Sequence, residues 1–222
     1  MLLYYITDRT QFPGTESQRR ENLLKKIAEA ALAGIDYIQL REKELPDRAL
    51  EPLAKAAAQL ICDSLSITRL LINSRTDVAL GAQAHGVHLP SNDISPPDVK
   101  KIWREAKGLG GPIIAVSCHS EADVIAAESA SDRVAADVHV RPVGADFVVF
   151  GPVFEKRGST ETAGLDQLRQ VCRHQIPVLA LGGVTTENAH LCTEAGASGV
   201  AGIRLFQEND VAAVVTKLRG LK

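Results

Sequence analysis

The chain has 222 residues, of which 45% are hydrophobic and 23% are charged. This composition is typical of globular proteins, and it excludes a disordered chain, a coiled coil and a collagen-like repeat. Because 25 basic residues nearly balance 27 acidic ones, the net charge is −2 and gives no general attraction to nucleic acid or anionic membranes. Five phenylalanines, three tyrosines and one tryptophan are too few for a nucleic-acid stacking platform. We therefore expect no nucleic-acid partner and no membrane partner.

The cysteines, Cys62, Cys118, Cys172 and Cys192, are far apart in the sequence and form no Cys-x-x-Cys metal or redox motif. The first residues, MLLYYITDRTQF, have neither the basic start nor the small-residue cleavage site of a signal peptide. No apolar stretch approaches the ~20 residues that a membrane-spanning helix requires. These features predict a cytoplasmic protein whose thiols are reduced.

Short apolar runs alternate with amphipathic segments along the chain. Apolar residues spaced by three and four, with charged residues between them, predict a helix that Gly34 ends. Ser120 is placed to cap a later helix, and Thr185 or Thr186 to cap another. Residues 131–144 fit no repeating unit, so we expect a long loop or an edge hairpin there. The expected strands are 2–7, 36–40, 69–73, 86–89, 112–117, 145–150, 177–182 and 199–203, and the expected helices are 20–33, 46–62, 75–82, one from Ser95, 120–130, 164–173, 185–195 and 208–219.

These elements form eight strand–helix units of similar length. Short strands with few polar positions are typical of parallel sheets that are buried on both faces. Units of this number and spacing predict a single α/β domain over residues 1–222, a (β/α)8 TIM barrel. An open doubly wound sheet is the alternative, but no GxGxxG motif follows the first strand.

In such barrels the active site forms where the strands end. Gly182 and Gly183 follow the seventh expected strand, and Gly202, Ile203 and Arg204 end the eighth. Backbone N–H groups exposed by glycines at helix starts bind phosphate well, so these residues predict a phosphate site. The alternative is that the glycines only supply the positive φ that a turn needs.

Charged and nucleophilic side chains follow other strands. Arg41 and Lys43 could hold a carboxylate or phosphate, or could form a solvated rim that Glu42 partly neutralises. His119 follows the fifth strand, where an imidazole can serve as general acid or base, although a lone histidine is more often structural. Cys118 fits a small buried residue better than a nucleophile.

Several aspartates lie near strand ends. Asp8, Asp77 and Asp93 have the carboxylate chemistry that Mg²⁺ prefers, although Asp77 also fits a structural role in the third helix. His88 lies on the fourth strand and faces either the barrel interior or the site. The sequence leaves these alternatives open.

Eight short segments, taken together, resemble the thiamine phosphate synthase/TenI superfamily, whose members are small (β/α)8 barrels. Each motif alone is weak, but their order across most of the chain is specific. They are YITDR (5–9), QLREK (39–43), LINSRTDVA (71–79), HGVHLP (85–90), AVSCHS (115–120), GADFVVFGPVF (144–154), PVLALGGVT (177–185) and AGASGV (195–200).

The resemblance implies one of two reactions. The synthase couples a pyrimidine diphosphate to a thiazole phosphate with Mg²⁺, whereas the TenI branch moves a proton in a carboxythiazole phosphate without a metal cofactor. Either reaction implies a small phosphorylated heterocycle as ligand and a homodimer as assembly. It also implies substrate contacts from Gln39, Arg41, Lys43, Asn73 and Ser117, and phosphate contacts from Gly182, Gly183, Gly202, Ile203 and Arg204.

Departures from the synthase pattern favour the TenI branch. Ser74 stands where the synthases have an acidic Mg²⁺ ligand, and Ser159 stands where they have a lysine, with Lys156 and Arg157 shifted nearby. Asp93 still matches the second Mg²⁺ aspartate. HLPS at 88–91 and FGPVFE at 150–155 look like the TenI branch.

The leading hypothesis is therefore a thiazole tautomerase in which His119 moves the proton and Arg41 holds the substrate carboxylate. A Mg²⁺-dependent synthase, with Asp93 as metal ligand, is the first alternative. A non-catalytic thiazole phosphate or thiamine phosphate binding protein is the second. Arg204 replaces the small serine that is usual in the family, and it could either strengthen phosphate binding or fill the site.

Overall fold

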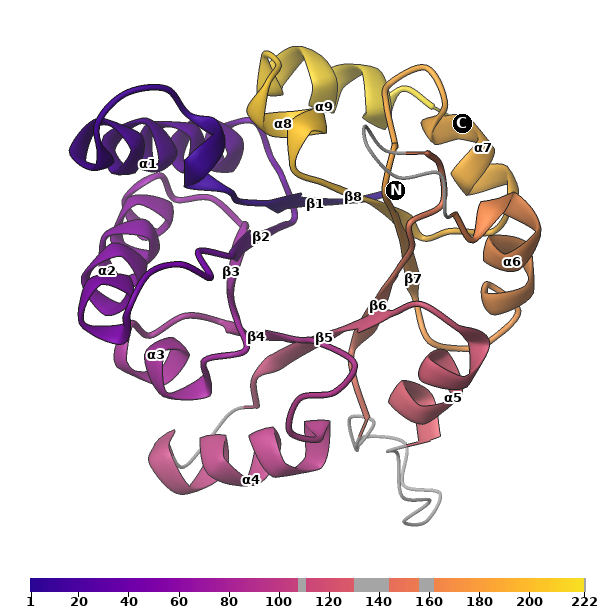
Figure 1. Cartoon of the computed structure of the whole chain (residues 1–222), viewed down its shortest axis with the longest axis horizontal. Coiled ribbons are helices and arrows are strands. Elements are labelled where there is room, and N and C mark those ends of the chain that lie inside the picture. Colours follow the sequence, from indigo (N-terminus) through magenta and orange to yellow (C-terminus); the bar gives the residue numbers. More distant parts are fainter. Residues whose placement is uncertain (108–110, 130–143, 156–161, 222) are drawn as a thin grey trace.

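The computed structural model describes residues 1–107, 111–129, 144–155 and 162–221. Its strands form one closed parallel barrel in the order β1-β2-β3-β4-β5-β6-β7-β8, with the helices around the outside (Figure 1). The (β/α)8 TIM barrel expected from the sequence is therefore confirmed. The strands are β1 (Leu2–Ile6), β2 (Tyr37–Leu40), β3 (Arg69–Asn73), β4 (Gly86–Leu89), β5 (Ile113–Cys118), β6 (Phe147–Phe150), β7 (Val178–Leu181) and β8 (Gly199–Gly202).

The helices follow the strands, with small shifts from the expected bounds. Residues 131–143 of the expected loop or hairpin lie outside the described residues. The helices are η1 (Arg9–Gln11, a 3-10 turn), α1 (Glu16–Leu32), α2 (Asp47–Asp63), α3 (Thr76–Gly81), α4 (Pro96–Lys107), α5 (Glu121–Ser129), α6 (Gly164–Val171), α7 (Ala189–Glu194), α8 (Arg204–Gln207) and α9 (Val211–Arg219).

Capping explains where the helix bounds differ. Helix α1 begins at Glu16 rather than 20, because Thr15 and Gln18 form a capping box. Helix α7 begins at Ala189 rather than 185, because the Thr185 hydroxyl accepts the Glu187 and Asn188 N–H groups in a turn before the helix.

The last expected helix, 208–219, begins at Val211 instead. Asp210 accepts the Ala213 N–H and caps α9, while the short α8 precedes it. The expected cap of α5 is confirmed, because the Ser120 hydroxyl accepts the Asp123 N–H at 3.2 Å.

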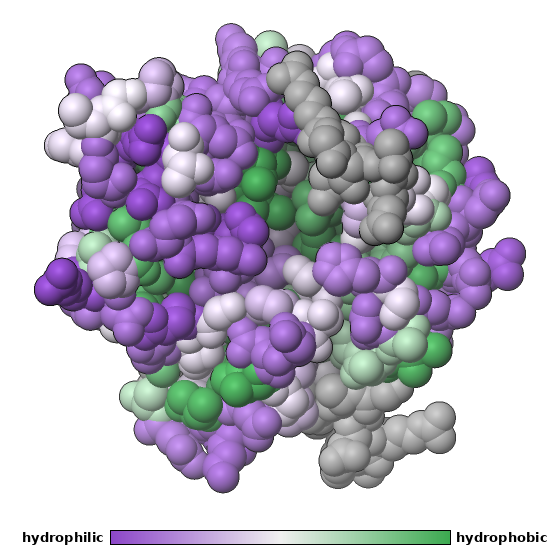
Figure 2. Space-filling model, viewed as in Figure 1, coloured by the Kyte–Doolittle hydropathy of each residue, from purple (hydrophilic) through white to green (hydrophobic). Residues whose placement is uncertain are grey.

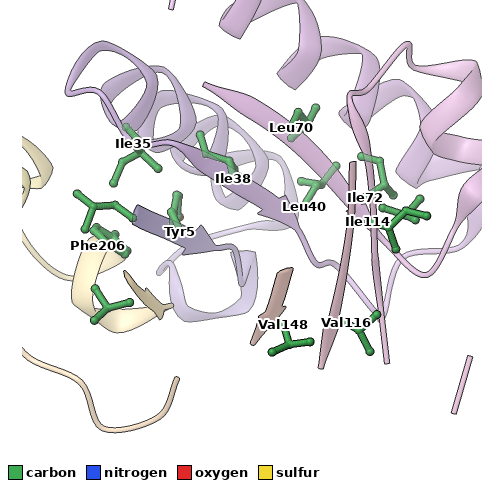
Figure 3. Close-up of a cluster of buried hydrophobic side chains, with 14 of the residues drawn as sticks. Tyr5, Ile35, Ile38, Leu40, Leu70, Ile72, Ile114, Val116, Val148 and Phe206 are labelled. Atoms are coloured by element: carbon green, nitrogen blue, oxygen red, sulfur yellow. The ribbon is translucent and has the colours of Figure 1, made fainter. Parts of the chain in front are cut away.

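Alternating side chains along each strand build two cores. The outer core fills the space between strands and helices, where Figure 3 shows Tyr5, Ile38, Leu70 and Phe206. The inner core fills the barrel itself. Its buried members are Tyr4, Ile6, Leu71, Ala115, Phe147, Val149, Leu179 and Ala201.

The inner core becomes polar toward the carboxyl ends of β2 to β5. Gln39 pairs in register with the inner-core residue Leu71, and Asn73 pairs with His88. His88 in turn pairs with the inner-core residue Ala115. The alternation that places apolar side chains inside the barrel thus also turns these polar ones inward.

The thiols differ in accessibility. Cys62, near the end of α2, is exposed, whereas Cys118 and Cys192 are buried. Burial raises the pKa of both buried thiols to about 12, and it raises the pKa of Cys172 to about 11. In the part of the chain that the structure describes, no helix is long and apolar enough to cross a membrane.

Candidate active site

A cavity of about 850 Å³ lies where the barrel strands end, and we call it the strand-end cavity. Figure 2 shows this face hollowed near its centre, with hydrophobic residues in the hollow and hydrophilic ones around it. Every substrate, phosphate and proton-transfer residue expected from the sequence lines this cavity, whereas the expected metal ligand Asp93 does not. The lining includes Gln39, Arg41, Lys43, Asn73, Ser117, His119, Gly182, Gly183, Gly202, Ile203 and Arg204.

Glycines after β7 form part of the wall. Gly182 and Gly183 have φ angles of +97° and +64°, which side-chain-bearing residues rarely adopt. A Cβ at Gly182 would lie 2.6 Å from Pro152, and one at Gly183 would lie 2.5 Å from the Glu155 carbonyl oxygen. Gly182 and Gly183 therefore supply the positive φ of a turn and also line the cavity. The missing Cβ atoms let the segment after β6 pack closely against this turn.

Arg41 and Lys43 follow β2 and line the cavity, with Glu42 between them. Glu42 is buried, accepts the Thr7 hydroxyl at 2.6 Å and forms an ion pair with Arg9 at 3.2 Å. Burial raises the pKa of Glu42, while the hydrogen bonds from Thr7 and Arg9 act in the opposite direction. The alternative of a solvated rim that Glu42 partly neutralises is not supported, because the buried Glu42 carboxylate pairs with Arg9. Two cationic side chains are thus presented to the cavity.

The His119 ring is held by the backbone carbonyl that follows β6. Its Nδ1 atom lies 2.6 Å from the Gly151 oxygen. Since a carbonyl oxygen can only accept, Nδ1 carries the hydrogen. Nε2 of the neutral ring is then the atom that can take up a proton. The His119 N–H also donates to the Asp123 carboxylate at 2.8 Å, which fixes the backbone at this point.

A hydrogen-bonded row of four side chains crosses the barrel at the cavity, and three of them line it. Gln39 Nε2 lies 3.2 Å from the Tyr4 hydroxyl, which lies 3.1 Å from His88 Nδ1. His88 Nε2 lies 2.7 Å from the Ser117 hydroxyl. Burial and the nearby charge of Arg41 lower the pKa of His88 to about 3, so the ring is neutral.

Sequence reasoning missed Tyr4 and left the orientation of His88 open. The row settles that orientation, because His88 is buried in the barrel and also lines the cavity. The period-two alternation of β1 was the one available signal, since it places Tyr4 on the same face as Ile6.

The aspartates do not gather into a metal site. Asp77 pairs with Arg75, and Asp8 accepts the Thr10 N–H at the start of η1. Among the residues that the structure describes, no three His, Cys, Asp or Glu side chains lie where they could hold a metal ion. With Ser74 in place of an acid and Asp93 outside the cavity lining, the described residues do not fit a protein-built Mg²⁺ site. Lys156, Arg157 and Ser159 lie outside the described residues.

Comparisons with known proteins agree with this architecture. The family model described as thiamine monophosphate synthase matches residues 3–206. A putative thiamine-phosphate synthase 2 of Aquifex aeolicus is 37% identical over 93% of this chain and 97% of its own length. A putative thiamine-phosphate synthase of Geobacter sulfurreducens is 40% identical, over 90% of this chain and 83% of its own length.

A solved structure supports the same conclusion. The thiamine phosphate pyrophosphorylase of Pyrococcus furiosus superimposes with a TM-score of 0.77 at 28% identity, covering 99% of this chain and 94% of that one. Because the family match spans nearly all strands and the relatives align over most of both chains, the chain belongs to the thiamine monophosphate synthase family.

Proposed function

We propose that this chain joins a thiazole phosphate to a pyrimidine diphosphate in the strand-end cavity, which forms thiamine phosphate. The observation that carries the proposal is the identity of 37–40% with two relatives named as putative thiamine-phosphate synthases, along nearly the whole chain. The lining of the cavity by the residues that the family resemblance implies supports it further.

The chain's own residues have separate roles in this reaction. Gly182, Gly183 and Gly202 receive the thiazole phosphate against backbone, and Arg204 adds a positive charge. The thiazole nitrogen attacks the methylene carbon of the pyrimidine, and the bond from that carbon to the diphosphate oxygen breaks. Arg41 and Lys43 stabilise the negative charge that develops on the departing diphosphate. Mg²⁺ would supply further positive charge there, but the described residues do not fit a site for it, and we derive no step through it.

The geometry favours a second candidate, the tautomerisation of a carboxythiazole phosphate. Its specific support is the fixed His119 ring, whose Nε2 can accept a proton, together with Ser74 in the place of an acid. In this reaction His119 takes a proton from one atom of the thiazole ring and returns it to another, so no net proton is consumed. Arg41 holds the carboxylate in this candidate.

One assay separates the candidates. The purified protein is mixed with pyrimidine diphosphate and thiazole phosphate, with and without Mg²⁺, and thiamine phosphate is measured by mass spectrometry. Multiple turnovers establish the synthase. If no product forms while calorimetry shows that thiazole phosphate binds, the synthase proposal is wrong. The tautomer assay on the same protein then decides between the second candidate and a binding protein without turnover. Light scattering of the same sample tests the expected homodimer.

A further inference from the structure

We infer that Tyr4 and His88 are positioning residues, which fix the Ser117 hydroxyl as a hydrogen-bond donor toward an acceptor atom of the ligand. The inference deepens the proposed function, because it rests on the strand-end cavity being the substrate site. It concerns buried side chains inside the barrel to which the proposed reaction assigns no step.

The side chains form one continuous row from β2 to β5. Gln39 contacts Tyr4 at 3.2 Å, Tyr4 contacts His88 at 3.1 Å, and His88 contacts Ser117 at 2.7 Å. Gln39, Tyr4 and His88 are each at most 3% exposed, whereas Ser117 is half-buried and lines the cavity. Gln39 and His88 also line the cavity, so the row connects buried side chains at the cavity wall with the more accessible Ser117.

The direction of the hydrogen bonds follows from the donors available. Gln39 Nε2 can only donate, so the Tyr4 oxygen accepts from it. Burial raises the pKa of Tyr4, so its hydroxyl keeps its hydrogen, and His88 Nδ1 is the acceptor within reach. Since His88 is neutral, its Nε2 then carries the hydrogen and donates to the Ser117 oxygen.

The opposite direction leaves a buried group unpaired. If His88 Nδ1 donated to Tyr4, the tyrosine oxygen would accept twice and its own hydrogen would have no acceptor among the contacts shown. An unpaired buried donor is costly, so the first direction is the stable one. Ser117 then receives a hydrogen bond and has its own hydrogen left to donate into the cavity.

Packing holds the Tyr4 ring in place. The Tyr4 ring meets Phe147 and Tyr37 edge-on, with ring centroids 5.6 Å and 5.9 Å apart. Arg41 also disfavours a charged His88, in which both nitrogens would be donors. The geometry thus selects a ligand that presents a lone pair to Ser117, such as a ring nitrogen or a phosphate or carboxylate oxygen.

The first test needs no substrate. The ¹⁵N NMR spectrum of the uniformly labelled full chain reports which ring nitrogen of each histidine carries hydrogen, and the His88→Asn variant assigns the His88 signals. We expect hydrogen on Nε2 and none on Nδ1 in the wild type. In Tyr4→Phe the Nδ1 signal should shift, because its donor is removed. Hydrogen on Nδ1 of the wild type would overturn the inference, whatever reaction the protein catalyses.

Tyr5→Phe is the matched control. Tyr5 is the next residue on β1, is equally buried, and donates to Gln207 at 2.8 Å on the outer side of the barrel. This variant loses a buried hydroxyl as Tyr4→Phe does, but its His88 signals should match the wild type. The thermal transitions of the two variants, measured by circular dichroism, show whether they are comparably folded.

The second test is a double-mutant cycle on turnover of the coupling reaction. We expect Tyr4→Phe to lower kcat by about 10-fold with KM changed less than about 2-fold, since one hydrogen bond that positions the donor is lost. Tyr4→Phe should have no further effect in the Ser117→Ala background, and additive effects would contradict the inference.

If the wild type does not catalyse the coupling reaction, the cycle is measured on calorimetric affinity for thiazole phosphate and for pyrimidine diphosphate separately. The substrate that loses affinity then identifies the acceptor, and the failure of the proposed reaction stays distinct from the failure of the inference.

Discussion

The strand-end cavity has two unlike walls. The wall formed by β2 to β5 presents polar side chains, among them Asn73 and Ser117, and it contains the hydrogen-bonded row through His88. The wall formed by β7 and β8, which we call the backbone wall, presents the turn at Gly182 and Gly183, together with charged side chains such as Arg204 and Glu208 from the segments that follow these strands. In the proposed function, the first wall contacts the ligand mainly through directed side chains, and the glycine turn of the second wall contacts it through backbone. We therefore expect that binding and chemistry can be changed separately in this barrel.

The largest expected effect comes from a substitution that distorts the backbone wall. In Gly183→Ala, the new Cβ would meet the Glu155 carbonyl oxygen at 2.5 Å and the Phe154 Cβ at 2.7 Å. The loop must shift, so we expect affinity for thiazole phosphate to fall by about 100-fold or more, because a phosphate site depends on close backbone approach. Isothermal titration calorimetry measures this.

Gly34→Ala separates strain from contact. Gly34 has a similar positive φ of +84°, but a Cβ there has nothing within 4 Å. It should cost about 1 kcal/mol of unfolding free energy and leave affinity unchanged. Equal losses of affinity in the two variants would show that the wall at Gly183 has no specific role.

The next effect tests the chemistry of the polar wall. We expect His119→Asn to lower the rate of tautomerisation by about 100-fold or more, because the group that takes up the proton is lost. Affinity for thiazole phosphate should stay nearly unchanged, since the proposed phosphate site lies on the opposite wall. The exposed His190→Asn is the control. A fully active His119→Asn enzyme would refute the role of this histidine.

Arg204 is a long cationic side chain on the backbone wall, and its replacement sharpens the comparison. We expect Arg204→Ser to weaken thiazole phosphate binding by about 10-fold, with a smaller difference at high salt, because a charged contact to phosphate is lost. Affinity measured at two ionic strengths checks this. Tighter binding by the variant would instead mean that Arg204 occupies space that the ligand needs.

The last prediction concerns stability and pH at a residue to which the proposed reaction assigns no step. The pKa of His88 falls from an ordinary 6.5 to about 3 in the folded protein. Between these values the unfolded chain binds a proton at this residue and the folded chain does not, so unfolding free energy should decrease as pH falls from 6.5 toward 3. The slope from one such group is about 1.4 kcal/mol per pH unit at most. Urea unfolding across this range should show a shallower dependence in His88→Gln.

His174→Gln provides a control of opposite sign. Hydrogen bonds from His174 to Glu128 and Glu121 raise the pKa of its ring. That residue therefore contributes stability that is present below pH 6.5 and is lost as pH rises through its folded pKa. If the slope of unfolding free energy against pH changed in the same way in His88→Gln and His174→Gln, the assignment of a neutral His88 in the folded protein would be wrong.

The barrel and the position of the cavity could be predicted because both follow from local patterns. Apolar strands alternate with amphipathic helices, and the residues directly after each strand must meet at one end. Contacts between distant residues could not be predicted. Tyr4 reads as ordinary core in an apolar run, and its partner His88 lies 84 residues further on. Glu42 lies between Arg41 and Lys43 in the sequence, yet its buried carboxylate pairs with Arg9, 33 residues away.

The distribution of thiols has a practical consequence for studying this protein. Only the thiolate reacts with maleimides and oxidants, and the raised pKa values of Cys118, Cys172 and Cys192 keep these thiols protonated. Cys62 is exposed near the end of α2, and β3 begins shortly after it, so it lies toward the opposite end of the barrel from the cavity. A fluorescent label should therefore attach at Cys62 without engineering, and should report tumbling and assembly while ligand binding proceeds undisturbed.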